Sequence, residues 1–446
     1  MHGTRSYITL AFGLILTLCA KTLRAQSDEA LYAELGQNFK GELKEYGEVT
    51  NARTQLWQKW TEAMSRRKSA LKLDLCSFDS LKAYILPLPE TLEPQAKMPY
   101  LWIDKGGTKT ARRGSVPTYI YLHGSGPKDH EWKATVGWAH AFEGTPSRYF
   151  IPQIPNEGKY YRWWQKSKQW AYKQLWRALV ADSLTDADRV MLLGVSEGGY
   201  GSQRLASFYA DYLAAAGPMA GGEPLINAPA ENLGHVAFSL LTGEKDAMFC
   251  RNYFTALTGQ ALDSLATQYP DEYVHRVEFV PGAGHGFDYR PTAPWLFKHK
   301  RQSHPHHFVW EDYAMDGCFR RGFYNLKIDR RPVESDTLRT RYEVSIATDG
   351  LIDITICGVH YEALEKEPQW GIPIKYDKTT YPISGGQLTI FLDENLVDLN
   401  KKVTVRLNGK RVWRGKLRLR REHLFESLRT FEDPKRLYPA AVTINY

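Results

Sequence analysis

The chain has 446 residues, of which 43% are hydrophobic and 24% are charged. This composition is typical of a globular protein, and the length predicts more than one domain. The formal net charge is +8 at pH 7, an excess too small for so long a chain to indicate a partner made of nucleic acid. The five cysteines match no metal-ligand spacing, so no metal site is predicted from them, and their pairing is left open.

Residues 1–25 have the features of a signal peptide. Arg5 precedes a short apolar run, and Ala25 offers a small residue for cleavage before Gln26. We therefore expect export to the periplasm or the cell exterior. The alternative is a lipoprotein acylated at Cys19, but Leu18 is bulky where processing favours a small residue. No later run reaches 18 apolar residues, so no membrane span is predicted.

Residues 26–97 are predicted to form a helical N-terminal extension, because apolar residues recur at helical spacing from Asp28 to about Leu75. Residues 98–325 instead alternate apolar runs with longer mixed stretches. These runs cover 98–104, 117–124, 148–155, 189–195, 212–218, 236–243 and 276–282. Helices are expected at 163–181 and 199–212. Such alternation predicts an α/β domain, with a doubly wound and mostly parallel sheet.

Residues 326–446 are predicted to form a β-rich C-terminal domain. Two pairs of alternating runs are joined at Asp349-Gly350 and at Asn408-Gly409, both of which favour tight hairpins. An antiparallel sandwich is the expected form. Basic residues alternate with apolar ones over 413–420, which indicates a solvated face; binding of an anionic polysaccharide or a membrane is the alternative reading.

The stretch Gly194-Val195-Ser196-Glu197-Gly198 has the form Gly-x-Ser-x-Gly. It directly follows a buried-looking strand and directly precedes a helix, which is where a sharp turn exposes a nucleophilic serine above the sheet edge. A serine hydroxyl needs a base within hydrogen-bond reach, and that base needs an orienting acid. The alternative reading of Ser196 is an ordinary serine in a glycine-rich turn.

Candidates for the acid and the base follow the next strands in the order expected after such a serine. Asp246 lies in the loop after 236–243, and His285 lies in a glycine-rich loop after 276–282. Both loops are at the carboxyl ends of predicted strands, where a doubly wound sheet binds its ligands. Glu244 and Asp288 remain alternatives for the acid.

Backbone donors for a developing oxyanion are predicted from two places. One is the loop after 117–124, where Gly124 or Ser125 would supply an N–H group. The other is Glu197, the residue after the candidate nucleophile.

These motifs resemble those of α/β-hydrolases over residues 98 to 300. The matching pieces are "YLHGSG", "GVSEGGYG", "AAAGPMAGG", "LTGEKDAMF" and "PGAGHGF". They are similar to dienelactone-hydrolase-like and polyhydroxybutyrate-depolymerase-like esterases and to the catalytic domain of the prolyl oligopeptidase group. The resemblance implies Ser196 as nucleophile, His285 as base and Asp246 as acid. The front end departs from the prolyl oligopeptidase pattern, because it lacks repeated four-stranded blades.

A cluster of aromatic residues follows the strand at 148–155. Tyr161, Trp163 and Trp164 are candidates for lining a substrate pocket, with packing in the interior as the alternative. His123 is a candidate for contacting substrate or for supporting the loop beside it. The run "SHPHHF" at 303–308 lacks a known metal-ligand pattern, so no metal is predicted.

The sequence thus predicts an exported serine hydrolase that needs no cofactor and cleaves a carboxylic ester, either a small molecule or one linked to a polysaccharide. A serine peptidase of the prolyl oligopeptidase type is the first alternative, because the same triad cleaves both bonds. A non-catalytic glycan-binding protein with a hydrolase fold is the second. The oligomeric state is not predicted.

Overall fold

The computed structural model describes residues 28–37, 39–67, 71–107, 111–332 and 338–446. The predicted signal peptide lies outside these residues. The chain divides into two compact units, one made of residues 1–70 and 418–441 and the other of residues 71–417 and 442–446. Within the described ranges, no helix combines the length and the apolar character needed to cross a membrane.

The described part of the first unit is helical. It contains α2 (Asp28–Gly36), α3 (Tyr46–Ser65), α9 (Arg421–Phe431) and the 3-10 helix η6 (Pro434–Arg436). The ring centroids of Tyr32 and Phe425 are 6.3 Å apart, and the Tyr32 hydroxyl donates to Glu432 across 2.6 Å. The C-terminal helix therefore packs with the N-terminal helices, although almost 400 residues separate them in the sequence.

The helices end earlier than the sequence predicts. Helices α2 and α3 cover Asp28–Gly36 and Tyr46–Ser65, but residues 71–97 belong to the larger unit and include β1 (Ala83–Pro87). This strand pairs with the next one in antiparallel fashion at the edge of the main sheet. An edge strand is held by its neighbour rather than by its own sequence pattern, so periodicity alone does not predict it.

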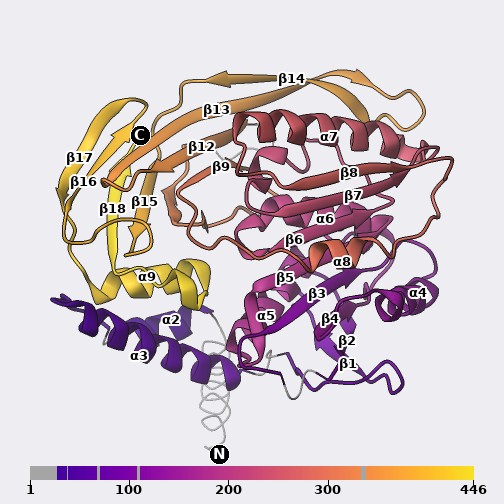
Figure 1. Cartoon of the computed structure of the whole chain (residues 1–446), viewed down its shortest axis with the longest axis horizontal. Helices are drawn as coiled ribbons and strands as arrows, with labels where there is room; N and C mark the ends of the chain where they lie inside the picture. Colours follow the sequence, from indigo (N-terminus) through magenta and orange to yellow (C-terminus); the bar gives the residue numbers. More distant parts are fainter. Residues whose placement is uncertain (1–27, 38, 68–70, 108–110, 333–337) are drawn as a thin grey trace, which may run out of the picture. The chain divides into compact units, whose positions relative to one another are not determined.

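The larger unit is built on an eight-stranded sheet (Figure 1). Its other strands are β2 (Lys97–Lys105), β3 (Val116–Leu122), β4 (Ser147–Pro152), β5 (Thr185–Val195), β6 (Ala215–Met219), β7 (Ala237–Gly243) and β8 (His275–Val280). The strand order is β1-β2-β4-β3-β5-β6-β7-β8. All pairs from β4 to β8 are parallel, so their carboxyl ends and the loops that follow them share one edge. All seven predicted strands of this sheet are confirmed.

Helices connect and cover these strands. They are α4 (Lys128–Ala141), α5 (Lys166–Ala181), α6 (Glu197–Phe208), α7 (Arg251–Gln268) and α8 (Thr292–Leu296), with the short 3-10 helices η2 (Gly158–Tyr160), η3 (Ala210–Tyr212), η4 (Ala230–Leu233) and η5 (Met248–Cys250). The two predicted helices correspond to α5 and α6. The fold class, a mixed α/β fold with a mostly parallel sheet, is confirmed.

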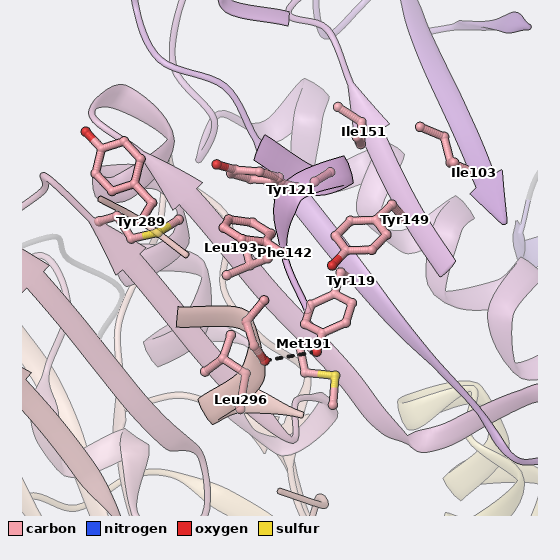
Figure 2. Close-up of a cluster of buried hydrophobic side chains, with 14 of the residues drawn as sticks. Ile103, Tyr119, Tyr121, Phe142, Tyr149, Ile151, Met191, Leu193, Tyr289 and Leu296 are labelled. Atoms are coloured by element: carbon pink, nitrogen blue, oxygen red, sulfur yellow. Dashed lines mark hydrogen bonds between the residues drawn. The ribbon is translucent and has the colours of Figure 1, made fainter. Parts of the chain in front are cut away.

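Side chains of the central strands form an apolar cluster with those of α4 and α8 (Figure 2). The rings of Tyr119 and Tyr149 stack with centroids 4.9 Å apart, and the Tyr119 hydroxyl donates to the carbonyl of Ala293 across 3.1 Å. Met191 and Leu193, which precede the candidate nucleophile on β5, are fully buried in the same cluster. The face of β5 that carries these two side chains, on the strand that leads to Ser196, is therefore fixed by packing.

The rest of the larger unit is mostly antiparallel β structure. Its strands are β9 (His307–Asp312), β10 (Gly322–Phe323), β11 (Leu326–Arg330), β12 (Leu338–Ile346), β13 (Leu351–Lys366), β14 (Pro373–Tyr381), β15 (Gln387–Leu392), β16 (Lys402–Leu407), β17 (Lys410–Lys416) and β18 (Ala440–Asn445). They form one sheet with the order β17-β16-β13-β12-β9, to which β14 is added beside β13, and a second with the order β10-β11-β15-β18.

Both predicted hairpins are present. Ile346 pairs with Ile352 across the turn that contains Asp349-Gly350, and Leu407 pairs with Lys410 across Asn408-Gly409. In the second turn φ is 47° at Asn408 and 78° at Gly409, the positive values that a two-residue hairpin turn needs. The pair β13 and β16 is parallel, so this region is not wholly antiparallel.

The long β13–β14 hairpin crosses the α/β part of the same unit (Figure 1). Tyr253 of α7 donates to the carbonyl of Ile374 on β14 across 3.3 Å. The ring centroids of Trp370, at the hairpin turn, and Phe249, in the loop after β7, are 5.1 Å apart. Residues 71–417 are therefore one compact unit, and the predicted domain division between 325 and 326 stays a prediction from the strand pattern.

Candidate active site

Ser196 occupies a strained turn between β5 and α6. Its backbone angles are φ 56° and ψ −113°, a combination that non-glycine residues rarely adopt and that clusters at functional sites. A Cβ atom at Gly194 would lie 1.8 Å from the carbonyl oxygen of Gly198, and one at Gly198 would lie 2.1 Å from that of Leu122. The turn is therefore possible only with glycine at both positions, as the Gly-x-Ser-x-Gly pattern indicates.

The structure brings Ser196, His285 and Asp246 together from three separate loops. Nε2 of His285 is 3.0 Å from Oγ of Ser196, and Nδ1 is 2.7 Å from Oδ2 of Asp246. Because a carboxylate only accepts hydrogen bonds, Nδ1 carries the proton and Nε2 is free to accept one from the serine hydroxyl. Asp246 is 4% exposed, whereas the His285 side chain is 46% exposed, so the base faces solvent and the acid does not.

The other two candidate acids have different partners. Glu244 accepts a hydrogen bond from the N–H of Gly282 across 2.7 Å, which fastens the loop after β7 to the loop after β8. Asp288 is exposed and holds Arg290 through both carboxylate oxygens. A further bond of 2.8 Å from the N–H of Lys245 to the carbonyl of Ala283 joins the same two loops. The choice among the three acidic residues therefore falls on Asp246.

Sequence reasoning missed Arg251, which is the first residue of α7. Its Nη1 donates to Oδ1 of Asp246 across 2.9 Å, so each oxygen of this carboxylate has a donor. The Arg251 side chain is 6% exposed, and a buried, charge-assisted bond of this kind fixes the carboxylate strongly. Only its position five residues after Asp246, at the start of the next helix, could have suggested it.

The predicted oxyanion loop lies against the nucleophile. A Cβ atom at Gly124 would lie 3.4 Å from Cβ of Ser196. Among the described residues, the N–H groups of Gly124, Ser125 and Glu197 have no hydrogen-bond partner. Unpaired backbone donors beside a nucleophile are what an oxyanion hole requires, so all three remain candidates.

Three residues predicted as possible substrate contacts support this loop from the interior instead. Trp163 is fully buried and its Nε1 donates to the carbonyl of His123 across 2.9 Å. The Tyr161 hydroxyl donates to the carbonyl of Gly124 across 3.0 Å. These buried contacts favour the interior alternative for Tyr161 and Trp163, and a role as substrate contacts stays a prediction.

His123 is fully buried as well. Its Nδ1 is 2.7 Å from the carbonyl of Gly124, and its Nε2 accepts from the N–H of Ile154 across 3.0 Å. Both ring nitrogens are thus engaged in the neutral form, and burial lowers the pKa of His123 to about 4. This histidine supports the loop and stays uncharged at neutral pH.

Trp164 differs from these residues because it is only partly buried. The guanidinium of Arg204 stacks over its ring at 3.8 Å from the centroid and also holds Glu223 through both carboxylate oxygens, at 2.7 and 3.0 Å. One face of the indole is therefore covered by a fixed cation. Its role as a substrate contact stays a prediction.

The side chain of Glu197 is buried beside the elbow. Burial raises the pKa of this carboxyl group to about 8, in spite of opposing effects from Arg162, Arg204 and Arg251. The closest of these approaches is 3.7 Å, from Nη1 of Arg162 to Oε2 of Glu197. The group next to the candidate nucleophile is therefore mostly protonated at neutral pH.

The histidines of the run at 303–308 have separate partners. Nε2 of His304 is 3.2 Å from Asp393, His306 faces two backbone carbonyls, and Nδ1 of His307 is 2.7 Å from Glu272. Within the part of the chain that the structure describes, no group of three or more histidine, cysteine, aspartate or glutamate side chains could hold a metal ion.

Comparison with known proteins gives matches only at the level of structure. No family model matches the chain, and no curated protein matches it. Of the solved structures, a thermostable esterase is 19% identical with a TM-score of 0.40 over 50% of this chain and 64% of its own, so the match spans less than two thirds of that esterase. A ferulic acid esterase is 15% identical with a TM-score of 0.37, over 49% of this chain and 95% of its own. A putative dipeptidyl aminopeptidase IV from Bacteroides ovatus is 12% identical with a TM-score of 0.37, over 49% of this chain and 34% of its own.

Proposed function

We propose that the chain is a serine hydrolase that cleaves a carboxylic ester through an acyl-enzyme on Ser196. The observation that carries the proposal is the hydrogen-bonded series of Ser196, His285 and Asp246, with distances of 3.0 and 2.7 Å. The strained backbone of Ser196 and the unpaired N–H groups beside it support the same proposal.

In the first half of the reaction, Nε2 of His285 accepts the proton of Ser196 as Oγ bonds to the carbonyl carbon. The carbonyl oxygen takes the negative charge and is stabilised by the N–H of Glu197 and that of Gly124 or Ser125. When the bond from carbon to the alcohol oxygen breaks, His285 returns the proton to that oxygen, and the alcohol leaves. Asp246 keeps the imidazole in the tautomer that these steps need.

In the second half, water takes the place of the alcohol. His285 accepts a proton from the water as its oxygen bonds to the acyl carbon, and the bond from that carbon to Oγ breaks. The proton passes to Oγ, so that Ser196 is restored and the carboxylic acid is released. No redox step or external group is needed, so the reaction balances with ester and water alone.

A fluorophosphonate probe tests whether the chain is an enzyme. We expect covalent labelling of the folded protein and its loss in Ser196→Ala. Ser183→Ala is the matched control, because Ser183 is exposed and lies in a turn before β5, and it should label as the unsubstituted protein does. Absence of labelling in folded protein would instead favour the non-catalytic glycan-binding alternative.

A second measurement separates ester from peptide hydrolysis. Matched substrates that share one acyl group, either as an ester or as a peptide amide, should be cleaved with a higher kcat/KM for the ester. Faster cleavage of the amide would overturn the ester assignment and favour a peptidase of the prolyl oligopeptidase type. The same triad serves both reactions, so only this ratio distinguishes them.

Export is a separate part of the proposal, and it is supported by the charged start, the short apolar run and Ala25 before Gln26. Expression of the full chain in a Gram-negative host should give a mature protein that begins near Gln26 in the periplasmic fraction. Intact N-terminal sequence in the cytoplasmic fraction would contradict it.

A further inference from the structure

A half-exposed arginine lies beside a buried carboxyl group next to the candidate nucleophile. The Arg162 side chain is 49% exposed, and its Nη1 is 3.7 Å from Oε2 of Glu197, the residue after Ser196. Glu197 is 6% exposed, and its Oε1 is buried with no hydrogen-bond partner among the described residues. A buried polar atom without a partner is rare in folded proteins, so Oε1 is a site for an ordered water, and Oε2 is the oxygen that faces Arg162.

The other cations around Glu197 are already neutralised. Arg204 holds both oxygens of Glu223, at 2.7 and 3.0 Å, and Arg251 is bonded to Asp246 across 2.9 Å. Besides its approach to Glu197, Arg162 donates to the backbone carbonyl of Tyr161 across 2.7 Å, and its guanidinium lies 6.0 Å from the centroid of the Trp164 ring. The positive charge that remains open to solvent beside the elbow is therefore that of Arg162.

The protonation state of Glu197 decides whether its carboxyl group neutralises the charge of Arg162. Burial raises the pKa of Glu197 to about 8, so at neutral pH the group is mostly uncharged. A protonated carboxyl group donates one hydrogen bond and leaves the adjacent positive charge uncompensated. An arginine beside a hydrogen-bond donor is a combination that recognises a carboxylate.

We propose that Arg162 and Glu197 together bind a carboxylate carried on the acyl part of the ester that Ser196 cleaves. This inference rests on the proposed function and narrows its substrates to esters of dicarboxylic acids or of other acids with an anionic group. Arg162 donates to the substrate carboxylate through its guanidinium, and Glu197 donates its acidic proton to the same group from Oε2, the oxygen that faces Arg162.

The strand order assigns this site to the acyl side of the scissile bond. His285 returns a proton to the leaving oxygen, so the alcohol lies toward the loops after β7 and β8. Arg162 belongs to the loop after β4, and β4 lies on the opposite side of β5 in the order β4-β3-β5-β6-β7-β8. A group that reaches from Ser196 to Arg162 therefore extends away from His285.

The test uses two 4-nitrophenyl esters that share one acyl chain, ending in a carboxylate in one (mono-4-nitrophenyl adipate) and in an uncharged carboxamide in the other. At pH 7 we expect kcat/KM to be about tenfold higher for the carboxylate, the usual size of a charge-assisted hydrogen bond at a partly exposed site. In Arg162→Gln the ratio should fall to about one. Arg411→Gln, at an exposed position on β17, is the control and should keep the wild-type ratio.

Two results would overturn the inference. One is a wild-type ratio near one, and the other is a tenfold ratio that persists in Arg162→Gln. In both cases the carboxamide ester is still cleaved if the proposed function is correct. Failure to cleave either ester, together with no fluorophosphonate labelling, would count against the proposed function itself.

The assignment to the acyl side has its own test. Esters of 4-carboxyphenol and 4-carbamoylphenol carry the same pair of groups on the alcohol. A ratio of kcat/KM that depends on Arg162 for these esters would overturn the assignment to the acyl side.

The part played by Glu197 is tested by pH. Its neighbours that carry or can carry charge are Arg162, Arg204, Arg251, Glu223 and Tyr161. Because ionised Glu197 would repel a carboxylate and pair with Arg162, the tenfold ratio should shrink from pH 7 to pH 9. In Glu197→Gln, which does not ionise, the ratio should stay constant over this range. If the wild-type ratio of kcat/KM for the two esters is constant to pH 9, Glu197 takes no part in binding the carboxylate.

Discussion

Arg251 donates to Oδ1 of Asp246 across 2.9 Å while the other carboxylate oxygen of that residue faces His285. The arginine and the aspartate are both almost fully buried. The candidate acid is thus held between a fixed cation and the imidazole that it orients.

Replacing Arg251 with glutamine should weaken both folding and turnover. Removal of one partner from a buried ion pair typically costs about 3–5 kcal/mol, because the remaining charge stays buried. We expect the free energy of unfolding to fall by that order and kcat/KM to fall more than about tenfold, since Asp246 loses one of its two constraints. Urea unfolding and ester hydrolysis measure the two effects.

Arg66→Gln is the control for this change. Arg66 makes a surface ion pair with Glu62 at 3.7 Å and is 78% exposed, so its loss should leave both quantities nearly unchanged. Equal effects of the two substitutions would mean that the pairing with Asp246 has no special part in the site.

Glu197 should make the free energy of unfolding fall as pH rises. Its pKa is raised by burial from 4.5 to about 8, so between these values the unfolded chain is ionised and the folded chain stays protonated. The contribution of this group to stability therefore falls as pH rises from about 4.5 to 8 and is constant above that. Glu197→Gln removes this dependence.

The measurement is the difference in unfolding free energy between Glu197→Gln and the unsubstituted protein. From pH 5 to pH 8 this difference should grow in favour of glutamine by on the order of 2–4 kcal/mol. Glu62→Gln, at an exposed position of α3, should give a difference that is flat with pH. A flat difference for Glu197→Gln would mean that Glu197 is ionised in the folded protein at neutral pH.

His307 should make stability depend on pH for a different reason. Burial lowers its pKa, but hydrogen bonds to Glu272 and Glu343 outweigh burial and raise the pKa to about 9. The imidazolium lies 2.7 Å from Glu272 and stacks on Tyr269 with ring centroids 4.6 Å apart. These contacts join β9, in the six-stranded sheet, to the segment between α7 and β8, which leads into the eight-stranded sheet.

A raised pKa in the folded state means that this stabilisation is complete below pH 6.5 and is lost as pH rises through about 9. The unfolding free energy of the protein should therefore decline between these values, and the decline should be smaller in His307→Gln. Chemical unfolding at half-unit intervals of pH checks this. Parallel curves for the two proteins would contradict the ion pairs at His307.

A methyl group at Gly198 should abolish the site. A Cβ atom there would lie 2.1 Å from the carbonyl oxygen of Leu122, and the backbone of β3 has no room to retreat. We expect Gly198→Ala either to fail to fold or to fold without fluorophosphonate labelling. Gly137→Ala is the control, because a Cβ atom in that part of α4 meets nothing within 4 Å and alanine should stabilise the helix by about 0.5–1 kcal/mol. Full labelling of Gly198→Ala would mean that the elbow tolerates a wider turn.

Much of the fold follows from patterns that are local in the sequence. The turn at Asn408-Gly409 needs two successive residues that accept positive φ, and few other dipeptides supply them. The elbow at Ser196 likewise requires glycine at Gly194 and Gly198, so five consecutive residues indicate both the turn and the exposed serine. Such features are predictable because the constraint and the residues that satisfy it are neighbours in the chain.

The sequence by itself therefore determined the strand and helix order, the hairpins and the position of Ser196. Only the tertiary structure decided which of three acidic residues faces His285, that Arg251 fixes it, and that Tyr161 and Trp163 support the glycine loop from the interior. These outcomes depend on where side chains from distant loops meet once the sheet has formed. Burial and hydrogen-bond geometry are properties of that meeting, and residue type and spacing along the chain do not specify them.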